Sequence, residues 1–141
     1  MKTHHHYLLA VIIAMILSSA TSFAQTVPDE AKKYYNRGQA ALEMATSKMD
    51  YQDAVLEFKK SIDAAPNWAE PYLAVAQVYE KLENYSNAID NYKKYLNLSP
   101  NGSNAEIART AIDKLGYKLD KQNETNKIIN LLSKLNRDDP Q

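Results

Sequence analysis

An internal repeat constrains the fold of this chain more than any other feature of its sequence. Two stretches align at an offset of 34 residues, DYQDAVLEFKKSIDAAPN at 50–67 and NYSNAIDNYKKYLNLSPN at 84–101. Upstream, two more align at an offset of 38, AKKYYNRGQAAL at 31–42 and AEPYLAVAQVYE at 69–80. Repeats of this period are typical of stacked helical units that share one core. The first unit has four extra residues between Ala41 and Tyr51, about one helical turn, and we expect them to lengthen its first helix.

Within each unit the apolar and small residues recur at helical intervals. In the second unit they fall at 72, 75, 76 and 79, and then at 85, 88, 89 and 92. This spacing predicts two amphipathic helices per unit. Small residues at Gly38 and Ala88 allow antiparallel helices to approach closely. Pro66 and Pro100 end the second helices, because proline lacks the amide donor and clashes with the preceding turn.

The pattern resembles the tetratricopeptide repeat family. The second unit matches the family's signature at Tyr72, Ala76, Tyr79, Tyr85, Ala88, Tyr92 and Pro100, and departs from it at Tyr95, where the family usually has a small residue. The first unit matches at Tyr34, Gly38, Tyr51, Ala54, Phe58 and Pro66. The resemblance covers about half of the chain. It implies an all-α fold of tandem antiparallel helix hairpins, a right-handed solenoid with repeats at about 29–66 and about 67–100.

Capping helices are expected after the repeats, over about 103–136. A fifth helix at 103–122 would carry the stripe Ile107, Ala111, Leu115 and Leu119, and would continue through Gly116. Residues 123–136 form a short amphipathic segment, which we interpret as a sixth helix folded back on the fifth. The alternatives are an apolar face exposed for a partner or for self-association as a homodimer, and a face that binds a membrane surface.

Polar residues that precede three of the helices suggest side-chain caps. The pairs are Thr26 with Asp29, Asn67 with Glu70, and Ser103 with Glu106. In each pair a polar residue stands three positions before an acidic one, which is the spacing of a capping pair.

Residues 1–24 read as a secretory signal peptide, and the helical domain then spans 25–141. Lys2 precedes an uncharged apolar run at 7–17, and the small residues Ser22 and Ala24 precede Gln25. At 11 residues the run reaches only about half of a hydrocarbon core of about 30 Å, so we expect cleavage and no stable membrane span. An uncleaved signal anchor is the alternative. The form of the signal favours a bacterial protein that is periplasmic or secreted.

The composition argues against catalysis, cofactors and nucleic-acid binding. The chain has no cysteine, and its histidines are His4, His5 and His6, which would leave with the signal. Thiol and imidazole chemistry, and the metal sites that depend on these ligands, are then not expected. The formal net charge is zero, and no run of Lys or Arg forms the basic stripe that nucleic acid requires.

In the tetratricopeptide family the first helix of each repeat lines a concave face that holds a partner protein or peptide. The resemblance assigns this role here to Tyr35, Gln39, Leu42, Leu73, Gln77 and Glu80. These residues lack a cluster of Lys or Arg, so the basic clamp of some relatives is not visible. Trp68 either packs at the turn between repeats or contacts the partner. We therefore expect a non-catalytic interaction or scaffold module, with a self-associating structural protein as the alternative.

Overall fold

The computed structural model describes residues 26–138, and the secondary structure of this part is entirely helical. Its elements are α2 (Asp29–Met44), α3 (Lys48–Ala64), α4 (Ala69–Lys81), α5 (Tyr85–Leu98) and α6 (Ala105–Asp138). The all-α prediction is confirmed. The expected signal peptide lies outside the described residues. None of the helices within 26–138 has the length and apolar character needed to cross a membrane.

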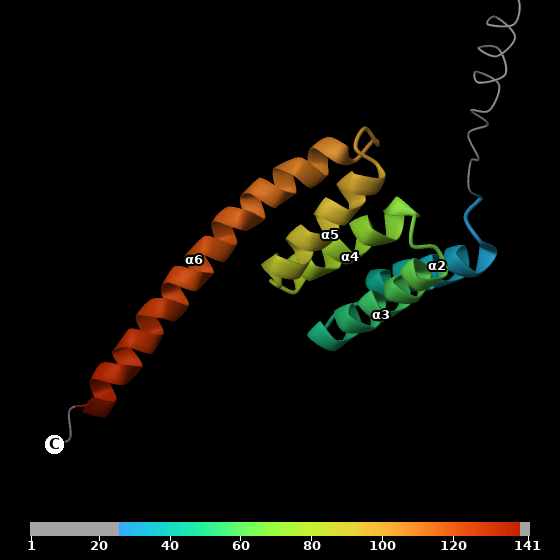
Figure 1. The fold of residues 1–141 in the computed structure, drawn as a ribbon. Coiled ribbons are helices and arrows are strands. Elements are labelled where there is room, and N and C mark those ends of the chain that lie inside the picture. The colour runs from blue at the N-terminus through green and yellow to red at the C-terminus, as the bar shows by residue number, and fades with distance from the viewer. Residues whose placement is uncertain (1–25, 139–141) are drawn as a thin grey trace, which may run out of the picture.

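The helices form two antiparallel hairpins and a final long helix (Figure 1). Helix α2 pairs with α3, α4 with α5, and each hairpin also packs on the next element along the chain. One buried cluster joins Ala54, Val55 and Phe58 of α3 to α4, and a second joins α4, α5 and the first half of α6. The tandem hairpins expected from the repeat are therefore present.

Small residues lie where the paired helices approach most closely. Ala54, Ala76 and Ala88 are fully buried. A Cβ atom built at Gly38 would lie 2.6 Å from two ring carbons of Phe58. Nearby, the Ser61 hydroxyl donates to the Ala31 carbonyl oxygen at 2.8 Å, which ties the end of α3 to the start of α2.

The extra turn of the first unit lies mainly in α3, so the prediction that it lengthens the first helix is wrong. After alignment, α2 ends one residue beyond the end of α4, whereas α3 starts three residues before the start of α5. A capping box explains this early start. The Asp50 backbone N–H donates to Ser47 Oγ at 3.3 Å, and the Ser47 N–H donates to Asp50 Oδ2 at 2.8 Å. These two bonds satisfy free amides at the first turn and fix the helix start at Lys48.

The three capping pairs expected from the sequence are not the caps observed. Helix α2 has Pro28 as its N-cap residue and α4 has Trp68, and neither makes a side-chain cap hydrogen bond. Packing accounts for the position of Trp68, because its ring lies 4.9 Å from the Tyr35 ring, measured between centroids. Ser103 does not cap α6 either, since its hydroxyl accepts a bond from the Asn104 side chain at 3.4 Å.

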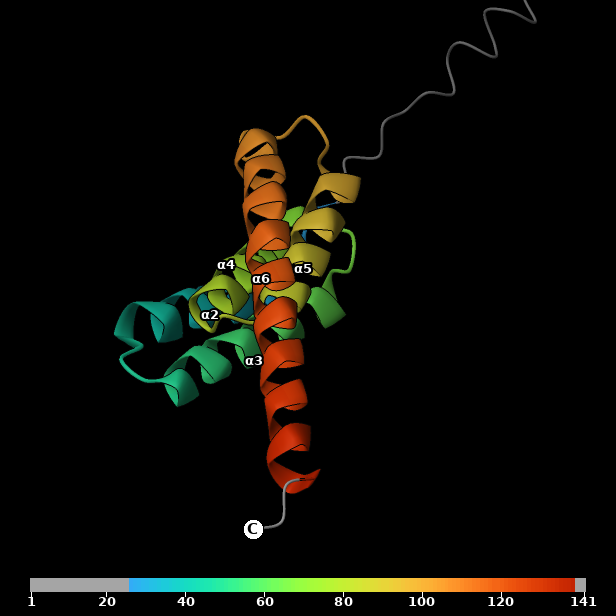
Figure 2. The same ribbon diagram turned by 90° about the vertical axis from the view of Figure 1, so that its left-hand side faces the viewer.

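Residues 103–136 do not form two helices, so the prediction of a folded-back sixth helix is wrong. Helix α6 runs unbroken for 34 residues and passes through Gly116 as expected. The sequence from Tyr117 to Arg137 contains neither glycine nor proline, so nothing in it breaks the helix. Every residue from 121 to 137 is exposed. We call these residues the α6 tip, and in both ribbon views they extend beyond the other helices (Figures 1 and 2).

Candidate partner-binding groove

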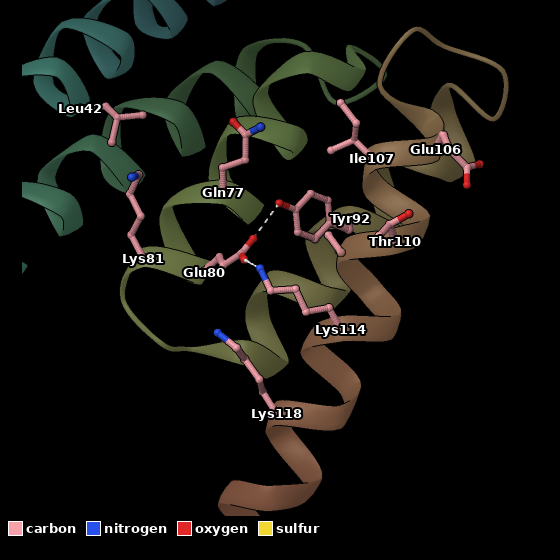
Figure 3. A pocket seen from close by; sticks show the side chains of 11 residues that line it. Leu42, Gln77, Glu80, Lys81, Tyr92, Glu106, Ile107, Thr110, Lys114 and Lys118 are labelled. Atoms are coloured by element: carbon pink, nitrogen blue, oxygen red, sulfur yellow. Dashed lines mark hydrogen bonds and ion pairs between the residues drawn. The ribbon is translucent and has the colours of Figure 1, made fainter.

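One open groove of about 750 Å³ brings together side chains from both hairpins and α6. Helix α2 contributes one residue, α4 three, α5 one and α6 the remainder (Figure 3). The lining residues are Leu42, Gln77, Glu80, Lys81, Tyr92, Glu106, Ile107, Thr110, Ala111, Lys114 and Lys118. We call this site the groove.

Glu80 lies at the centre of the groove and connects three helices. Its Oε2 accepts a hydrogen bond from the Tyr92 hydroxyl of α5 at 3.2 Å. Its Oε1 lies 3.2 Å from Nζ of Lys114 of α6 (Figure 3). The Glu80 side chain is only 26% exposed, so partial burial limits the competition of water for both bonds. This network fixes the groove wall formed by α6 relative to α4.

The Tyr92 hydroxyl is a neutral donor in this network. Burial raises the pKa of Tyr92 well above its ordinary value, and the negative charge and hydrogen bond of Glu80 raise this pKa further. Tyr92 therefore stays protonated at neutral pH and serves as a positioning group for the Glu80 carboxylate.

The rest of the groove combines positive charge with apolar surface. The lining includes three basic residues, Lys81, Lys114 and Lys118, and two acidic ones, Glu80 and Glu106, which leaves one net positive charge. Leu42, Ile107 and Ala111 supply apolar contact area, and Ile107 is 57% exposed. Such a surface suits a segment that offers both polar and apolar side chains.

Three of the six residues assigned to partner binding lie in the groove, namely Leu42, Gln77 and Glu80. The other three do not line it. Leu73 is buried in the cluster shared with α5 and α6. Tyr35 packs against Phe58 and Trp68 at centroid distances of 5.5 and 4.9 Å, and Gln39 donates to the Tyr35 hydroxyl at 3.0 Å. Partner binding by the six residues stays a prediction.

The groove residues on α6 were not found by sequence reasoning. Ile107, Thr110 and Lys114 follow one another at helical spacing, so the signal was present. It was missed because 103–122 was interpreted only as a cap. An interpretation of α6 as a third groove-lining helix would have identified them.

Acidic side chains do not gather into a metal site in the part of the chain that the structure describes. Among residues 26–138, no group of three or more His, Cys, Asp or Glu side chains could hold a metal ion. The acidic residues of the groove instead pair with neighbours, as Glu80 does with Lys114.

Comparison with known proteins identifies the repeat. Residues 69–101 match the family model described as tetratricopeptide repeat. This part of the chain is similar to a tetratricopeptide repeat. The chain is 34% identical over 73 residues to tetratricopeptide repeat protein 16 of Homo sapiens and of Macaca fascicularis. That alignment covers 52% of this chain but only 8% of the length of either relative.

A solved structure shares the fold. The TPR2B domain of yeast Sti1, determined in complex with pHsp70, superposes with a TM-score of 0.56 at 20% sequence identity. The match covers 81% of this chain and 90% of that domain. At this identity the likeness concerns the fold alone.

Proposed function

We propose that this chain is a tetratricopeptide repeat protein and serves as a non-catalytic scaffold that holds a segment of a partner protein in the groove. The observation that carries the proposal is the groove itself, an open site lined by side chains of four helices and fixed by the Glu80 network. The TPR2B domain of yeast Sti1, which has the same fold, was determined in complex with pHsp70. A protein partner is therefore the class of ligand that we infer for this chain.

The chemistry of the groove supports binding over catalysis. A nucleophile needs an adjacent base that activates it, whereas Tyr92 is held protonated and Glu80 is engaged by two donors. Tyr92 and Glu80 therefore hold each other in position, and neither is free to act as a nucleophile or a base. The groove offers Lys81 and Lys118 to polar groups of the segment, and Ile107 to an apolar side chain.

We further propose that the protein acts in the cell envelope or the extracellular space. The support is the signal-like sequence at 1–24, with its apolar run and small residues before Gln25. Mass spectrometry of the protein recovered from its own cells tests this. A mature chain that begins at Gln25 is expected, and an intact N-terminus in a cytoplasmic fraction would contradict it.

Substitution of two exposed groove residues tests whether the groove binds the partner. Ile107→Glu combined with Lys118→Glu removes an apolar contact and a positive charge without touching the Glu80 network. Partner proteins that co-purify with the wild type from the envelope fraction should be lost, while the circular dichroism spectrum and melting temperature stay unchanged.

Lys93→Glu is the matched control, because Lys93 is exposed on α5 and does not line the groove. This variant should retain the partners. Recovery of the same partners by the Ile107→Glu, Lys118→Glu protein would show that the groove is not the binding site.

A further inference from the structure

The α6 tip presents a face of large apolar side chains that no other part of the described chain covers. The exposed fractions lie between 52% and 67% for Ile128, Ile129, Leu131, Leu132 and Leu135. Leaving such side chains in water is unfavourable in proportion to their apolar area. Five of them within about two helical turns form an exposed apolar patch of the kind that marks a binding site.

Helix geometry shows that this face is separate from the one that packs on the bundle. At about 100° per residue, Ile128, Leu132 and Leu135 fall within about 60° of one another, and Ile129 and Leu131 widen the apolar arc to about 160°. The residues that pack α6 onto α5, such as Ala108 and Leu115, are centred about 140° away. The tip therefore does not continue the core face of α6, and its apolar side chains have no place in the bundle.

The charges around this face are mainly basic. The acidic residue of the α6 tip is Glu124, which pairs with Lys121 at 3.0 Å. From Thr125 to Arg137 the helix carries Lys127, Lys134 and Arg137 and no acidic residue. Lys127 and Lys134 lie about 40 to 60° beyond Leu131, along one edge of the apolar arc. The remaining surface consists of Asn and Ser side chains. The face therefore favours an anionic occupant.

A second copy of the chain is a poor occupant on two grounds. The apolar pattern covers residues 128–135, about 12 Å of helix, whereas a coiled-coil seam needs three or four heptads. A stable interface also needs about 800 Å² from each partner. In addition, pairing two tips would bring lysines together with no carboxylate on this stretch to offset them.

The width of the apolar face also favours a broad surface over a single helix as the binding partner of the tip. One partner helix covers a narrow seam, while an arc of about 160° suits a broad apolar medium. A helix with an aliphatic face, basic flanks and low overall hydrophobicity lies in the plane of a lipid interface. The tip extends clear of the bundle (Figure 2), so the hairpins do not shield it.

We propose that the α6 tip binds an anionic lipid surface, with Ile128, Leu132 and Leu135 inserted among the lipids and Lys127 and Lys134 against the headgroups. The apolar area of five half-exposed side chains is small, so binding is reversible. Each basic residue strengthens it about fivefold at an anionic surface. The tip thereby holds the groove close to a membrane without spanning it.

A fluorophore on the tip tests the proposal in the full chain. Because the chain has no cysteine, Leu131→Cys carries a single polarity-sensitive label on the apolar face, and Ser133→Cys carries it on the polar face. The apolar run at 7–17 is common to both proteins, so it does not affect the comparison. Vesicles with 30% phosphatidylglycerol in phosphatidylcholine should shift the emission of the label at 131 to the blue and leave the label at 133 nearly unchanged.

Variants of the labelled protein then separate the contribution of the apolar side chains to vesicle binding from that of the basic ones. With the label at 131, Ile128→Gln with Leu132→Gln should abolish the shift. Lys127→Gln with Lys134→Gln should weaken the binding about thirtyfold. Asn130→Gln with Ser133→Gln, on the opposite face, should bind like the wild type.

Three results would overturn the proposal. The first is no shift at 131 on anionic vesicles. The second is equal shifts at 131 and 133, which would mean that no single face enters the lipid. The third is a blue-shifted label at 131 without vesicles, together with a doubled mass in light scattering, which would assign the face to a second copy.

Discussion

At the scale of single residues, Gly38 marks the tightest contact in the first hairpin. Replacing it with Ala should improve helix propensity by about 1 kcal/mol. However, the new methyl group would lie 2.6 Å from ring carbons of Phe58, which is fully buried and cannot move freely. Overpacking of this kind costs about 1–3 kcal/mol. We expect Gly38→Ala to lower the free energy of unfolding by up to about 2 kcal/mol, measured by chemical denaturation.

Gly116 provides a matched control for this substitution. It also lies inside a helix, but a Cβ atom there would meet nothing within 4 Å. Gly116→Ala should therefore leave stability unchanged or raise it by up to about 1 kcal/mol. If both variants shifted stability in the same direction, the contact with Phe58 would not be what selects glycine at 38.

Tyr92 predicts a dependence of stability on alkaline pH. Burial and the Glu80 carboxylate raise its pKa in the folded state above the unfolded value, which is about 10. The native state then binds more protons than the unfolded state above pH 10, so stability falls as the pH rises. We expect Tyr92→Phe to lose about 1 kcal/mol at pH 7, where the hydroxyl still donates to Glu80.

Denaturation at pH 7 and pH 11 checks this expectation. The stability gap between the wild type and Tyr92→Phe should narrow at pH 11, because only the wild type loses stability through this hydroxyl. Tyr35 and Tyr72, whose pKa values burial also raises, are present in both proteins. A gap that stays constant with pH would contradict the role of Tyr92.

The positions of residues that pack within their own repeat unit were easier to predict from the sequence than the surroundings of residues that point away from it. The small residue at 38 and Ala88 were recognised because period and size together specify a close helix pair. Leu73 and Tyr35 were assigned to the partner face, yet Leu73 is buried and Tyr35 packs on Trp68. The period shows which residues share a face. It does not show which neighbouring element later covers that face.

At the scale of elements, the end of α4 contains a residue in an unfavourable conformation. Glu83 has a φ of 55°, in the left-handed region that disfavours a Cβ atom. Its N–H donates to the Glu80 carbonyl at 3.1 Å, and the Asn84 N–H donates to the Tyr79 carbonyl at 2.9 Å. These bonds form the helix-ending turn in which glycine is preferred.

Glu83→Gly should therefore raise the free energy of unfolding by about 1 kcal/mol, because it relieves the left-handed strain. Thermal melting monitored by circular dichroism measures the change. Glu83→Ala is the control, since alanine keeps the Cβ atom and should give no gain. Equal stabilisation by both variants would point to the lost charge and away from the backbone.

The helix pairs were predictable from the sequence, but several of their ends were not. Pro66 and Pro100 ended α3 and α5 as expected, because proline acts through local geometry. The start of α3 was missed, although Ser47 and Asp50 have the spacing of a capping box. The four-residue insertion was assigned to α2. The alignment places the insertion only between the matched positions Ala41 and Tyr51, and this interval includes the end of α2 and the start of α3. The capping hydrogen bonds between Ser47 and Asp50 place most of the inserted residues in α3.

At the scale of the whole molecule, α6 combines two surfaces that the sequence did not distinguish. Its first half completes the groove through Ile107 and Lys114, and its second half extends as the tip. The segment at 123–136 was expected to fold back because its apolar residues resemble a core stripe. Reversal needs a turn, and residues 117–137 contain no glycine or proline to make one. A helix that continues straight carries its apolar face beyond the bundle.

This architecture predicts that the bundle folds without the tip. Ending the chain after Lys121 removes only residues that are exposed where the structure describes them. The melting temperature should stay within about 2 °C of the wild type, because ΔΔG near zero shifts it little, while the helical signal falls in proportion to the lost residues. Ending the chain after Gly116 also removes Leu119, which packs on the second buried cluster, and this shorter chain should melt at a clearly lower temperature. A large destabilisation by the first truncation would mean that the tip packs on the bundle in solution, and its apolar face would then be unavailable to any outside surface.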